Sequence, residues 1–457
     1  MARLRGGELM ASVHAGPLHA APATVLAQRL RAGECTAEAV MQGCLDRIAA
    51  VEPEVQAWAH LDAARALAQA RGADRRRAAG EPLGALHGVP VGLKDIIDTS
   101  DFPTENGTVL HAGRRPGNDA ALVTRLRAAG AVILGKTVTT ELATYAPGKT
   151  RNPHQPEHTP GGSSSGSAAA VAAGMVPLAL GTQTNGSVIR PAAFCGVYGY
   201  KPTAGLISRT GVLRQSQTLD QIGMFARTLG DVALLAEQLI GFDAADPQVL
   251  PREALSLLAA ATGNSPRAPQ LAFVKTPLWD RADAETRELI ADLVARLGDG
   301  TVEQAMPAAA VGAWDWHRTI MEAEIAANFD AEWAQGRDRL SASLRGQIER
   351  GRTVSAFDYQ QAIARIPLVN RAFSEMYSRF DAILTLAVAG TAPLGLGSTG
   401  DPAFCTLWTF CGMPALNLPL LRGANGLPLG VQLVGPRMGD AQLLRAARWL
   451  VDFLAQC

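Results

Sequence analysis

The first 80 residues have the apolar spacing of helices. Val40, Cys44 and Ile48 repeat every four positions and form one stripe on a helix that Thr36 can cap at its N-terminus. An Ala- and Arg-rich segment from about residue 61 to 79 continues the helical pattern. We therefore expect a helical segment at the N-terminal end of the fold.

The pattern changes at His87, where short apolar runs begin to alternate with helical stretches. Three of these runs are "VPVGLKDII", "AVILGKT" and "VPLALGTQ". Between the first two, the stretch from 118 to 129 places Leu122, Val123 and Leu126 on one helical face. Strands that alternate with helices indicate a largely parallel sheet with helices on both faces.

The second half of the chain is mostly helical before strands return. Residues 230–380 contain one strand-like run, "LAFV" at 271–274, and "AILTLAV" begins the return at 382. "PALNLPLL" and "LPLGVQLVG" flank Gly423-Ala424-Asn425-Gly426, a hairpin signal, and an amphipathic helix follows over about 439–455.

No repeat, low-complexity linker or domain boundary interrupts these elements. They predict one large α/β domain over 1–457, with a twisted mixed, largely parallel sheet covered by helices on both faces. Its expected parts are a helical N-terminal segment (1–80), a core (86–231), a mainly helical pocket region (232–380) and a C-terminal return to the sheet (381–457).

Composition and charge exclude some classes of partner. Hydrophobic residues make up 47% of the 457 positions, and 42 Lys and Arg residues balance 42 Asp and Glu residues. Without a net field of either sign, we expect neither nucleic acid nor an anionic membrane as a partner. Only five of the 42 basic residues are lysines, so each lysine is a candidate for a specific role.

The spacing of the cysteines and the N-terminal residues indicate the cellular compartment of the protein. No C-x-x-C pair occurs, which favours free thiols in a reducing compartment over a disulfide framework. Glu8 and His14 interrupt any apolar segment after Arg3 and Arg5, and no run approaches about 18 apolar residues. We expect a cytoplasmic protein without signal peptide or membrane span. The six cysteines are Cys35, Cys44, Cys195, Cys405, Cys411 and Cys457.

The stretch "GGSSSGSAAAVAAG" at 161–174 fits several kinds of site. As a G-x-S-x-G elbow it would make Ser164 a nucleophile, but the three prolines of "NPHQPEHTP" before it prevent the buried strand that an elbow needs. Only His317 lies downstream as a base. A phosphate-binding loop would need a lysine where Ser167 stands. The remaining interpretation is a Gly/Ser loop that enters a tightly packed helix of small residues.

His154 and His158 form H-x-x-E-H, a zinc-protease pattern. That site needs a regular helix, which places both histidines on one face. Pro156 inside the motif prevents such a helix. We therefore expect loop histidines and no metal.

Two further segments accompany the serine-rich stretch, "HGVPVGLKDIID" at 87–98 and "LGTQTNGSVIRPAAFCGVYGYKPTAG" at 180–205. With all three in this order the chain resembles the amidase signature family, which includes malonamidases, peptide amidases, fatty acid amide hydrolases and the amidase subunit of the tRNA-dependent amidotransferase. The resemblance extends from Leu86 to Asp231 and continues more weakly to the C-terminus. It implies an amide hydrolase that needs no metal and no organic cofactor.

The same resemblance assigns the catalytic roles. It implies that Ser187 is the nucleophile, that Ser163 relays its proton and that Lys94 is the base. Ser163 is implied to follow a cis peptide bond after Gly162.

A lysine base must be neutral, so the pKa of Lys94 has to fall from about 10.4 to near 7. Burial among Val91, Leu93 and Ile96 would supply that shift. Taken alone, Lys94 is also explained as a surface lysine paired with Asp95.

The turn before the nucleophile departs from the commoner family pattern. Gln183 and Asn185 stand where an aspartate and a glycine often occur, and Arg190 follows the nucleophile by three residues rather than two. Asparagine tolerates left-handed backbone, so the turn can still form, or its side chain can contact substrate. Arg190 can brace the loop or meet a substrate carboxylate. The resemblance places the oxyanion hole on the backbone N–H groups of Thr184, Asn185, Gly186 and Ser187.

The implied reaction is hydrolysis of a C–N amide bond through an acyl-enzyme, with anilides, esters and carbamates (urethanes) within reach of the same chemistry. We expect a monomer or homodimer that acts on a small molecule, which contacts Gly162, Tyr145 and Arg190. The alternatives are the amidase subunit of an amidotransferase complex, a serine esterase of α/β-hydrolase type and a non-catalytic binding protein. Segments expected to shape the pocket are 144–149, 308–333 and 395–404.

Overall fold

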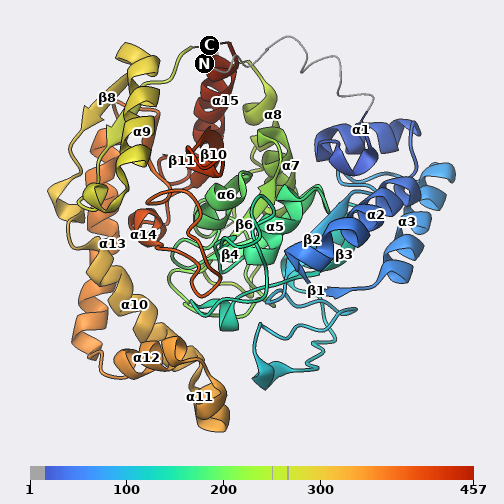
Figure 1. Cartoon of the computed structure of the whole chain (residues 1–457), viewed down its shortest axis with the longest axis horizontal. Helices are drawn as coiled ribbons and strands as arrows, with labels where there is room; N and C mark the ends of the chain where they lie inside the picture. Colours follow the sequence, from blue (N-terminus) through green and yellow to red (C-terminus); the bar gives the residue numbers. More distant parts are fainter. Residues whose placement is uncertain (1–15, 250, 265–266, 457) are drawn as a thin grey trace.

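One eleven-stranded sheet runs through the molecule (Figure 1). The computed structural model describes residues 16–249, 251–264 and 267–456. Within them the strand order is β1-β3-β2-β4-β6-β5-β10-β11-β9-β7-β8. The strands are β1 (Trp58–Leu61), β2 (Pro90–Lys94), β3 (Val132–Thr137), β4 (Leu178–Gln183), β5 (Tyr198–Lys201), β6 (Gln221–Ala226), β7 (Leu271–Val274), β8 (Thr301–Gln304), β9 (Ala382–Leu386), β10 (Ala415–Arg422) and β11 (Pro428–Val434).

Parallel and antiparallel pairs occupy different parts of the sheet. In one wing β2 pairs in parallel with β3 and β4, and in the other β7 pairs in parallel with β8 and β9. Strands β6, β5, β10 and β11 connect the wings through antiparallel pairs. The predicted mixed sheet within one large α/β domain is confirmed, with its parallel strands in the two wings.

Helices cover both faces of the sheet, as predicted (Figure 1). α7, α8 and α15 pack against one another over one face, while α10, α12, α13 and α14 form a group with a hydrophobic core of its own. The helices are α1 (Ala23–Ala32), α2 (Ala37–Val55), α3 (Ala63–Ala78), α4 (Ala121–Ala128), α5 (Ser165–Ala172), α6 (Ile189–Cys195), α7 (Leu229–Leu239), α8 (Leu257–Thr262), α9 (Ala284–Leu297), α10 (Ala313–Asn328), α11 (Asp330–Gly336), α12 (Ala342–Gly351), α13 (Ala356–Tyr377), α14 (Ala403–Phe410) and α15 (Asp440–Gln456).

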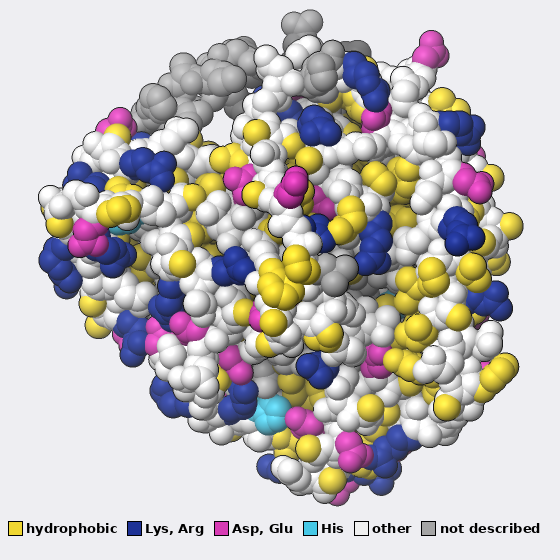
Figure 2. All heavy atoms as spheres, turned by 180° about the vertical axis from the view of Figure 1, so that it is seen from behind, with side chains coloured by type: hydrophobic (Ala, Val, Ile, Leu, Met, Phe, Trp, Pro, Cys, Tyr) yellow, Lys and Arg dark blue, Asp and Glu magenta, His cyan; other side chains and the backbone are white. Residues whose placement is uncertain are grey.

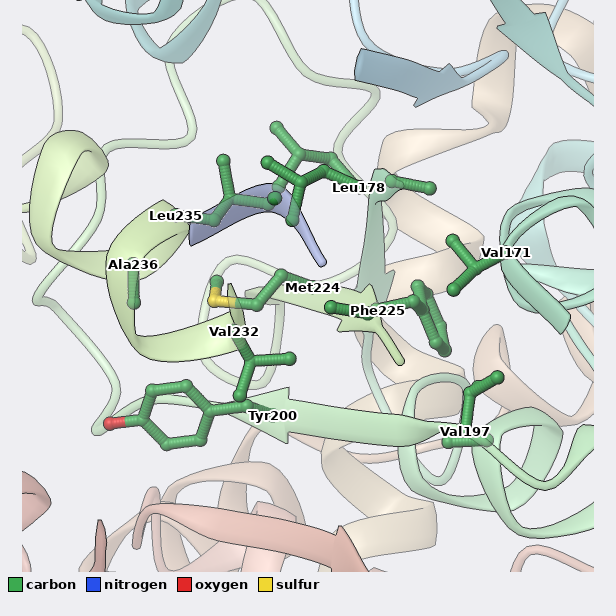
Figure 3. Packing of buried hydrophobic residues seen from close by; sticks show 14 of the residues in the cluster. Val171, Leu178, Val197, Tyr200, Met224, Phe225, Val232, Leu235 and Ala236 are labelled. Atoms are coloured by element: carbon green, nitrogen blue, oxygen red, sulfur yellow. The ribbon is translucent and has the colours of Figure 1, made fainter. Parts of the chain in front are cut away.

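The main core lies on either side of β6 (Figure 3). Met224 and Phe225 are consecutive in this strand, so their side chains point to opposite faces. Met224 lies toward Val232 and Leu235 of α7, whereas Phe225 lies toward Val171 of α5. All five side chains are buried, and each such burial stabilises the fold by roughly 1.5–3 kcal/mol. The centre of the sheet is therefore packed between α5 on one face and α7 on the other.

Several predicted elements occur where the sequence indicates them. Thr36 caps α2, because its Oγ1 accepts a hydrogen bond from the Ala39 N–H at 3.1 Å. The Gly423–Gly426 signal lies between β10 and β11, which pair antiparallel. The helices expected over 61–79 and 439–455 are α3 and α15.

Four strands have no counterpart in the sequence analysis: β1, β5, β6 and β8. They are four to six residues long and lack a clear alternation of apolar and polar positions. β1, for example, pairs with β3 across more than 70 positions of chain. Pairing partners so distant in sequence stabilise a short strand without leaving a local pattern.

Charged groups are mixed on the surface. On the face seen in Figure 2, Lys and Arg side chains are interspersed with Asp and Glu side chains and with apolar ones.

Among the described residues no helix is both long and apolar enough to cross a membrane. The five described cysteines are free thiols; Cys457 and residues 1–15, on which the signal-peptide prediction depends, lie outside the described residues.

Candidate active site

Lys94 is the last residue of β2, and its side chain is fully buried. Its Nζ lies 2.7 Å from Ser163 Oγ and 2.9 Å from Thr182 Oγ1. Burial lowers the pKa of Lys94 to about 7, and the negative charge of Asp220 partly opposes this shift. Near neutral pH a substantial fraction of Lys94 is therefore an uncharged amine in contact with a serine hydroxyl.

The alternative ion pair between Lys94 and Asp95 does not form. Asp95 Oδ1 instead lies 3.1 Å from Nζ of Lys136, another fully buried lysine. Asp95, His60 and Glu105 are the one group of described residues whose donor atoms lie close enough together to hold a metal ion. Within that group, the carboxyl group of Asp95 is already in contact with Lys136 Nζ.

The serine-rich stretch forms the entry to α5. Ser164 Oγ donates to the Thr182 carbonyl and accepts from the Thr182 N–H, both at 3.2 Å. Ser167 Oγ donates to the Leu180 carbonyl at 2.8 Å. A Cβ on Gly166 would lie 2.2 Å from the Ala57 carbonyl oxygen, so this helix start packs directly on neighbouring backbone. Ser164, the nucleophile that the elbow pattern would require, is therefore hydrogen-bonded to the backbone of β4. This favours the interpretation of a Gly/Ser loop that enters a tightly packed helix.

Ser163 lies at the start of this loop, and the Gly162–Ser163 peptide bond is cis, as the resemblance implied. The carbonyl of Gly162 accepts a hydrogen bond from Arg190 Nη2 at 2.7 Å, and the same nitrogen donates to Thr399 Oγ1 at 3.1 Å. Arg190 is buried, and its Nε and Nη1 have no hydrogen-bond partner among the described residues. Of the two roles considered for Arg190, these contacts favour bracing the loop.

The turn between β4 and α6 is held from several sides. Gln183 Oε1 accepts hydrogen bonds from the N–H groups of Val188 and Ile189 at 2.9 and 3.1 Å. A glutamine therefore satisfies the free N–H groups at the start of α6, as a carboxylate would. Asn185 Nδ2 donates to Tyr145 Oη at 3.0 Å, so the asparagine amide is held by a protein side chain.

Ser187 lies at the end of this turn and is 8% exposed. Its hydroxyl has no hydrogen-bond partner within the described ranges, whereas Lys94 and Ser163 are joined directly. Of the three predicted catalytic residues, the structure brings Lys94 and Ser163 into contact, and the roles of all three stay predictions. Catalytic hydrogen bonds of free enzymes often tighten only when substrate binds.

Two further residues hold Thr184: His317, which lies in the segment 308–333 expected to shape the pocket, and Asp220, which the sequence analysis did not single out. His317 of α10 is buried, and its Nε2 lies 2.8 Å from the Thr184 carbonyl oxygen. Asp220 accepts a hydrogen bond from Thr184 Oγ1 at 2.6 Å, and burial raises the pKa of Asp220 to about 6. Their sequence separations from Thr184 are 133 and 36 residues, so no local signal points to them.

His317 is unsuited to the role of base that an elbow would give it. Burial lowers the pKa of His317 to about 4, so the ring is neutral near pH 7. Because Nε2 faces a carbonyl, which only accepts, this nitrogen carries the proton.

The two histidines of the H-x-x-E-H pattern bind backbone in different places. His154 Nε2 lies 2.9 Å from the Cys195 carbonyl oxygen, and His158 Nδ1 lies 2.7 Å from that of Ala392. These contacts agree with the expectation of loop histidines.

A cavity of about 330 Å³ adjoins the site at Thr182 and Thr184. Of the three segments expected to shape a pocket, only 308–333 lines this cavity, through Asn328. Most of its wall comes from residues that follow β5, because the chain there folds back past the end of β4. The lining segments are 209–215, 220–222 and 245–247.

Comparison with known proteins identifies the family. A family model described as Amidase matches residues 39–444. The chain belongs to the amidase family. It is an amidase-signature hydrolase that acts on C–N amide bonds, and its fold and the recognition of its motifs are thereby confirmed.

Named relatives of this amidase-family chain fall into two groups. A glutamyl-tRNA(Gln) amidotransferase subunit of Chloroflexus aggregans is 35% identical, over 91% of this chain and 93% of that protein, and its counterpart in Symbiobacterium thermophilum is 36% identical over 91% and 93%. Among solved structures, the native peptide amidase from Stenotrophomonas maltophilia is 29% identical with a TM-score of 0.83, covering 95% of this chain and 97% of the other. A 6-aminohexanoate cyclic dimer hydrolase complexed with substrate is 25% identical with a TM-score of 0.85, covering 96% and 98%.

Proposed function

We propose that this amidase-family enzyme hydrolyses small linear amides through an acyl-enzyme on Ser187, with Lys94 as base and Ser163 as proton relay. The supporting observation is the contact between Lys94 Nζ and Ser163 Oγ at 2.7 Å, in surroundings that lower the pKa of Lys94 to about 7. Most serine hydroxyls are poor nucleophiles until a base removes the proton. Lys94 is a base of suitable pKa that is already hydrogen-bonded to Ser163.

The proposed reaction proceeds in two halves. Ser187 Oγ forms a bond to the acyl carbon as its proton passes to Ser163, whose own proton passes to Lys94. The carbonyl oxygen becomes an oxyanion, which backbone N–H groups of the turn stabilise. Lys94 returns the proton through Ser163 to the leaving nitrogen, the C–N bond breaks and the amine departs. Water, activated by the same relay, then attacks the acyl carbon, the relay returns a proton to Ser187 Oγ as the ester bond breaks, and the acyl group departs as the carboxylic acid.

The cavity beside Thr184 favours a small, uncharged substrate group. Arg209 in the wall is already paired with Asp246 at 2.8 Å, and Arg214, the other cationic residue of the lining, is exposed to solvent. Asp220 is hydrogen-bonded to Thr184. Gln215 and Asn328 supply amide groups to the wall. A neutral amide group of a few heavy atoms fits this lining, and a carbamate presents the same polarised acyl carbon.

A second candidate is the amidase subunit of an amidotransferase complex, which the names of the 35–36% identical relatives favour. Such a protein would release ammonia from glutamine for a partner. The two functions differ in whether the purified chain works alone.

A substrate panel distinguishes the two candidates. Purified protein would be incubated with p-nitroanilides, short aliphatic amides, aryl carbamates and glutamine, while a fluorophosphonate probe reports on the nucleophile. We expect turnover of at least one amide by the chain alone, and labelling that Ser187→Ala abolishes. Turnover of glutamine only, and only after addition of partner subunits, would establish the second candidate instead. Labelling of the Ser187→Ala variant at the wild-type rate would refute the assignment of Ser187.

A further inference from the structure

Three successive carbonyl groups of the turn are each held by a donor from a different element. The Thr184 carbonyl accepts from His317 Nε2 of α10 at 2.8 Å. The Asn185 carbonyl accepts from Thr409 Oγ1 of α14 at 2.5 Å. The Gly186 carbonyl accepts from the backbone N–H of Arg190 in α6 at 3.0 Å.

Each of these contacts also orients an N–H group. In a trans peptide unit the C=O of one residue and the N–H of the next point in opposite directions. Fixing the carbonyls of residues 184, 185 and 186 therefore aims the N–H groups of Asn185, Gly186 and Ser187 away from His317, Thr409 and α6. None of these three N–H groups has a hydrogen-bond partner in the part of the chain that the structure describes.

These three N–H groups lie in a buried turn and are available to an acceptor that is not part of the chain. The turn residues are at most 8% exposed, and buried backbone donors are paired in more than about 90% of cases. Three such donors in succession suit an oxygen that gains negative charge during the reaction.

Two of the three donors that hold the carbonyls are side-chain groups, those of His317 and Thr409. His317 donates through Nε2, because a carbonyl cannot donate in return. Thr409 Oγ1 accepts from Gln183 Nε2 at 2.9 Å, which leaves its single proton for an acceptor. That proton has the Asn185 carbonyl at 2.5 Å and the Cys405 carbonyl of its own helix at 3.0 Å.

We propose that His317 and Thr409 are positioning residues, which orient the turn's peptide units so that the N–H groups of Asn185 and Gly186 meet the oxyanion of the reaction. This role rests on the proposed function and deepens it, since it explains why helices α10 and α14 pack against the turn. Neither side chain contacts the reacting atoms, because each binds the carbonyl of a peptide unit whose N–H points the opposite way.

Paired substitutions separate orientation from packing. Thr409→Val keeps the shape of the side chain and removes the hydroxyl, whereas Thr409→Ser keeps the hydroxyl. His317→Leu removes the ring donor, whereas His317→Gln retains an N–H donor at similar reach. Arg318→Ala changes the neighbouring residue on the exposed side of α10, where Asp315 is its one ion-pair partner among the described residues, and serves as the control.

We expect the donor-deleting variants to lose about 10- to 100-fold in kcat, less than the roughly 100- to 1,000-fold typical of deleting an oxyanion donor outright. KM should change less than about threefold, because the lost interaction forms only as charge develops. A trifluoromethyl ketone, which forms a tetrahedral adduct with the nucleophile, should lose affinity by a similar factor to kcat/KM. Thr409→Ser, His317→Gln and Arg318→Ala should stay within about threefold of wild type.

The outcomes distinguish this proposal from the proposed function. Wild-type turnover and Ser187 labelling test the function itself, and failure of both would remove it together with the positioning role. With an active wild type, donor-deleting variants that keep full kcat would overturn the positioning role alone. The positioning role would also be overturned if the donor-deleting variants changed KM, kcat and thermal stability together. A Thr409→Ser variant that loses as much activity as Thr409→Val would overturn it as well. If His317→Leu fails to fold, the Thr409 pair decides the question.

Discussion

The pH dependence of activity offers a direct test of Lys94. Burial lowers its pKa from the ordinary value of 10.5 to about 7, a shift equivalent to about 5 kcal/mol at ~1.36 kcal/mol per unit. At pH 7 about half of the molecules would then hold a neutral Lys94, compared with on the order of one in 3,000 for an unperturbed lysine. Because only the neutral amine accepts a proton, kcat/KM should rise with pH through about 7 and level off above it.

Removing a neighbouring charge identifies which lysine is responsible for the rise of kcat/KM with pH. Lys201 is also fully buried with a pKa lowered to about 7, but it feels the charge of Asp440, whereas Lys94 feels Asp220. Both carboxylates favour the protonated lysine. Asp220→Asn should therefore move the acid limb of the profile to lower pH, and Asp440→Asn should leave its position unchanged. The reverse pattern would assign the limb to Lys201.

Substitution of Lys94 completes this test. Lys94→Arg keeps a cation that does not deprotonate near neutral pH, so it should lose several orders of magnitude in kcat/KM, as should Lys94→Ala. Folding would be verified by circular dichroism. A folded Lys94→Arg enzyme with more than roughly a tenth of wild-type activity, a loss under ~1.4 kcal/mol, would show that positive charge suffices and refute the base.

The same contacts support three other predictions. Ser187→Ala should abolish turnover and fluorophosphonate labelling, whereas Ser164→Ala should still be labelled but unfold at lower temperature, because it loses both bonds to Thr182. Lys94→Met should raise the free energy of unfolding by roughly 2–4 kcal/mol at pH 7, since folding no longer costs deprotonation of this lysine; the gain should shrink toward pH 10, where the unfolded lysine is also losing its proton. EDTA should leave activity unchanged, and zinc-reversible inhibition would revive a metal role for His154 and His158.

The sequence predicts the part of the site whose residues lie in recognisable motifs. Lys94, Ser163 and Ser187 occur in three recognisable segments, and the structure joins the first two directly. Their catalytic roles stay predictions that the variants above test. Asn185 was ambiguous in sequence because its side chain could point either way, and Tyr145 and Thr406 hold it within the protein.

The alternation of strands and helices, the hairpin near the C-terminus and the three segments that carry the family resemblance could all be predicted from the sequence. These features are local, because hydrophobic periodicity, turn residues and motif spacing operate within a few to a few tens of residues. The placement of β1, β5, β6 and β8, the cavity wall and the donors that hold the turn became visible in the folded structure alone. Thr409 and His317 reach the turn across 224 and 133 residues, and the low pKa of Lys94 comes from complete burial under packed elements. Such properties belong to contacts between distant segments, which form only when the sheet and its helices are assembled.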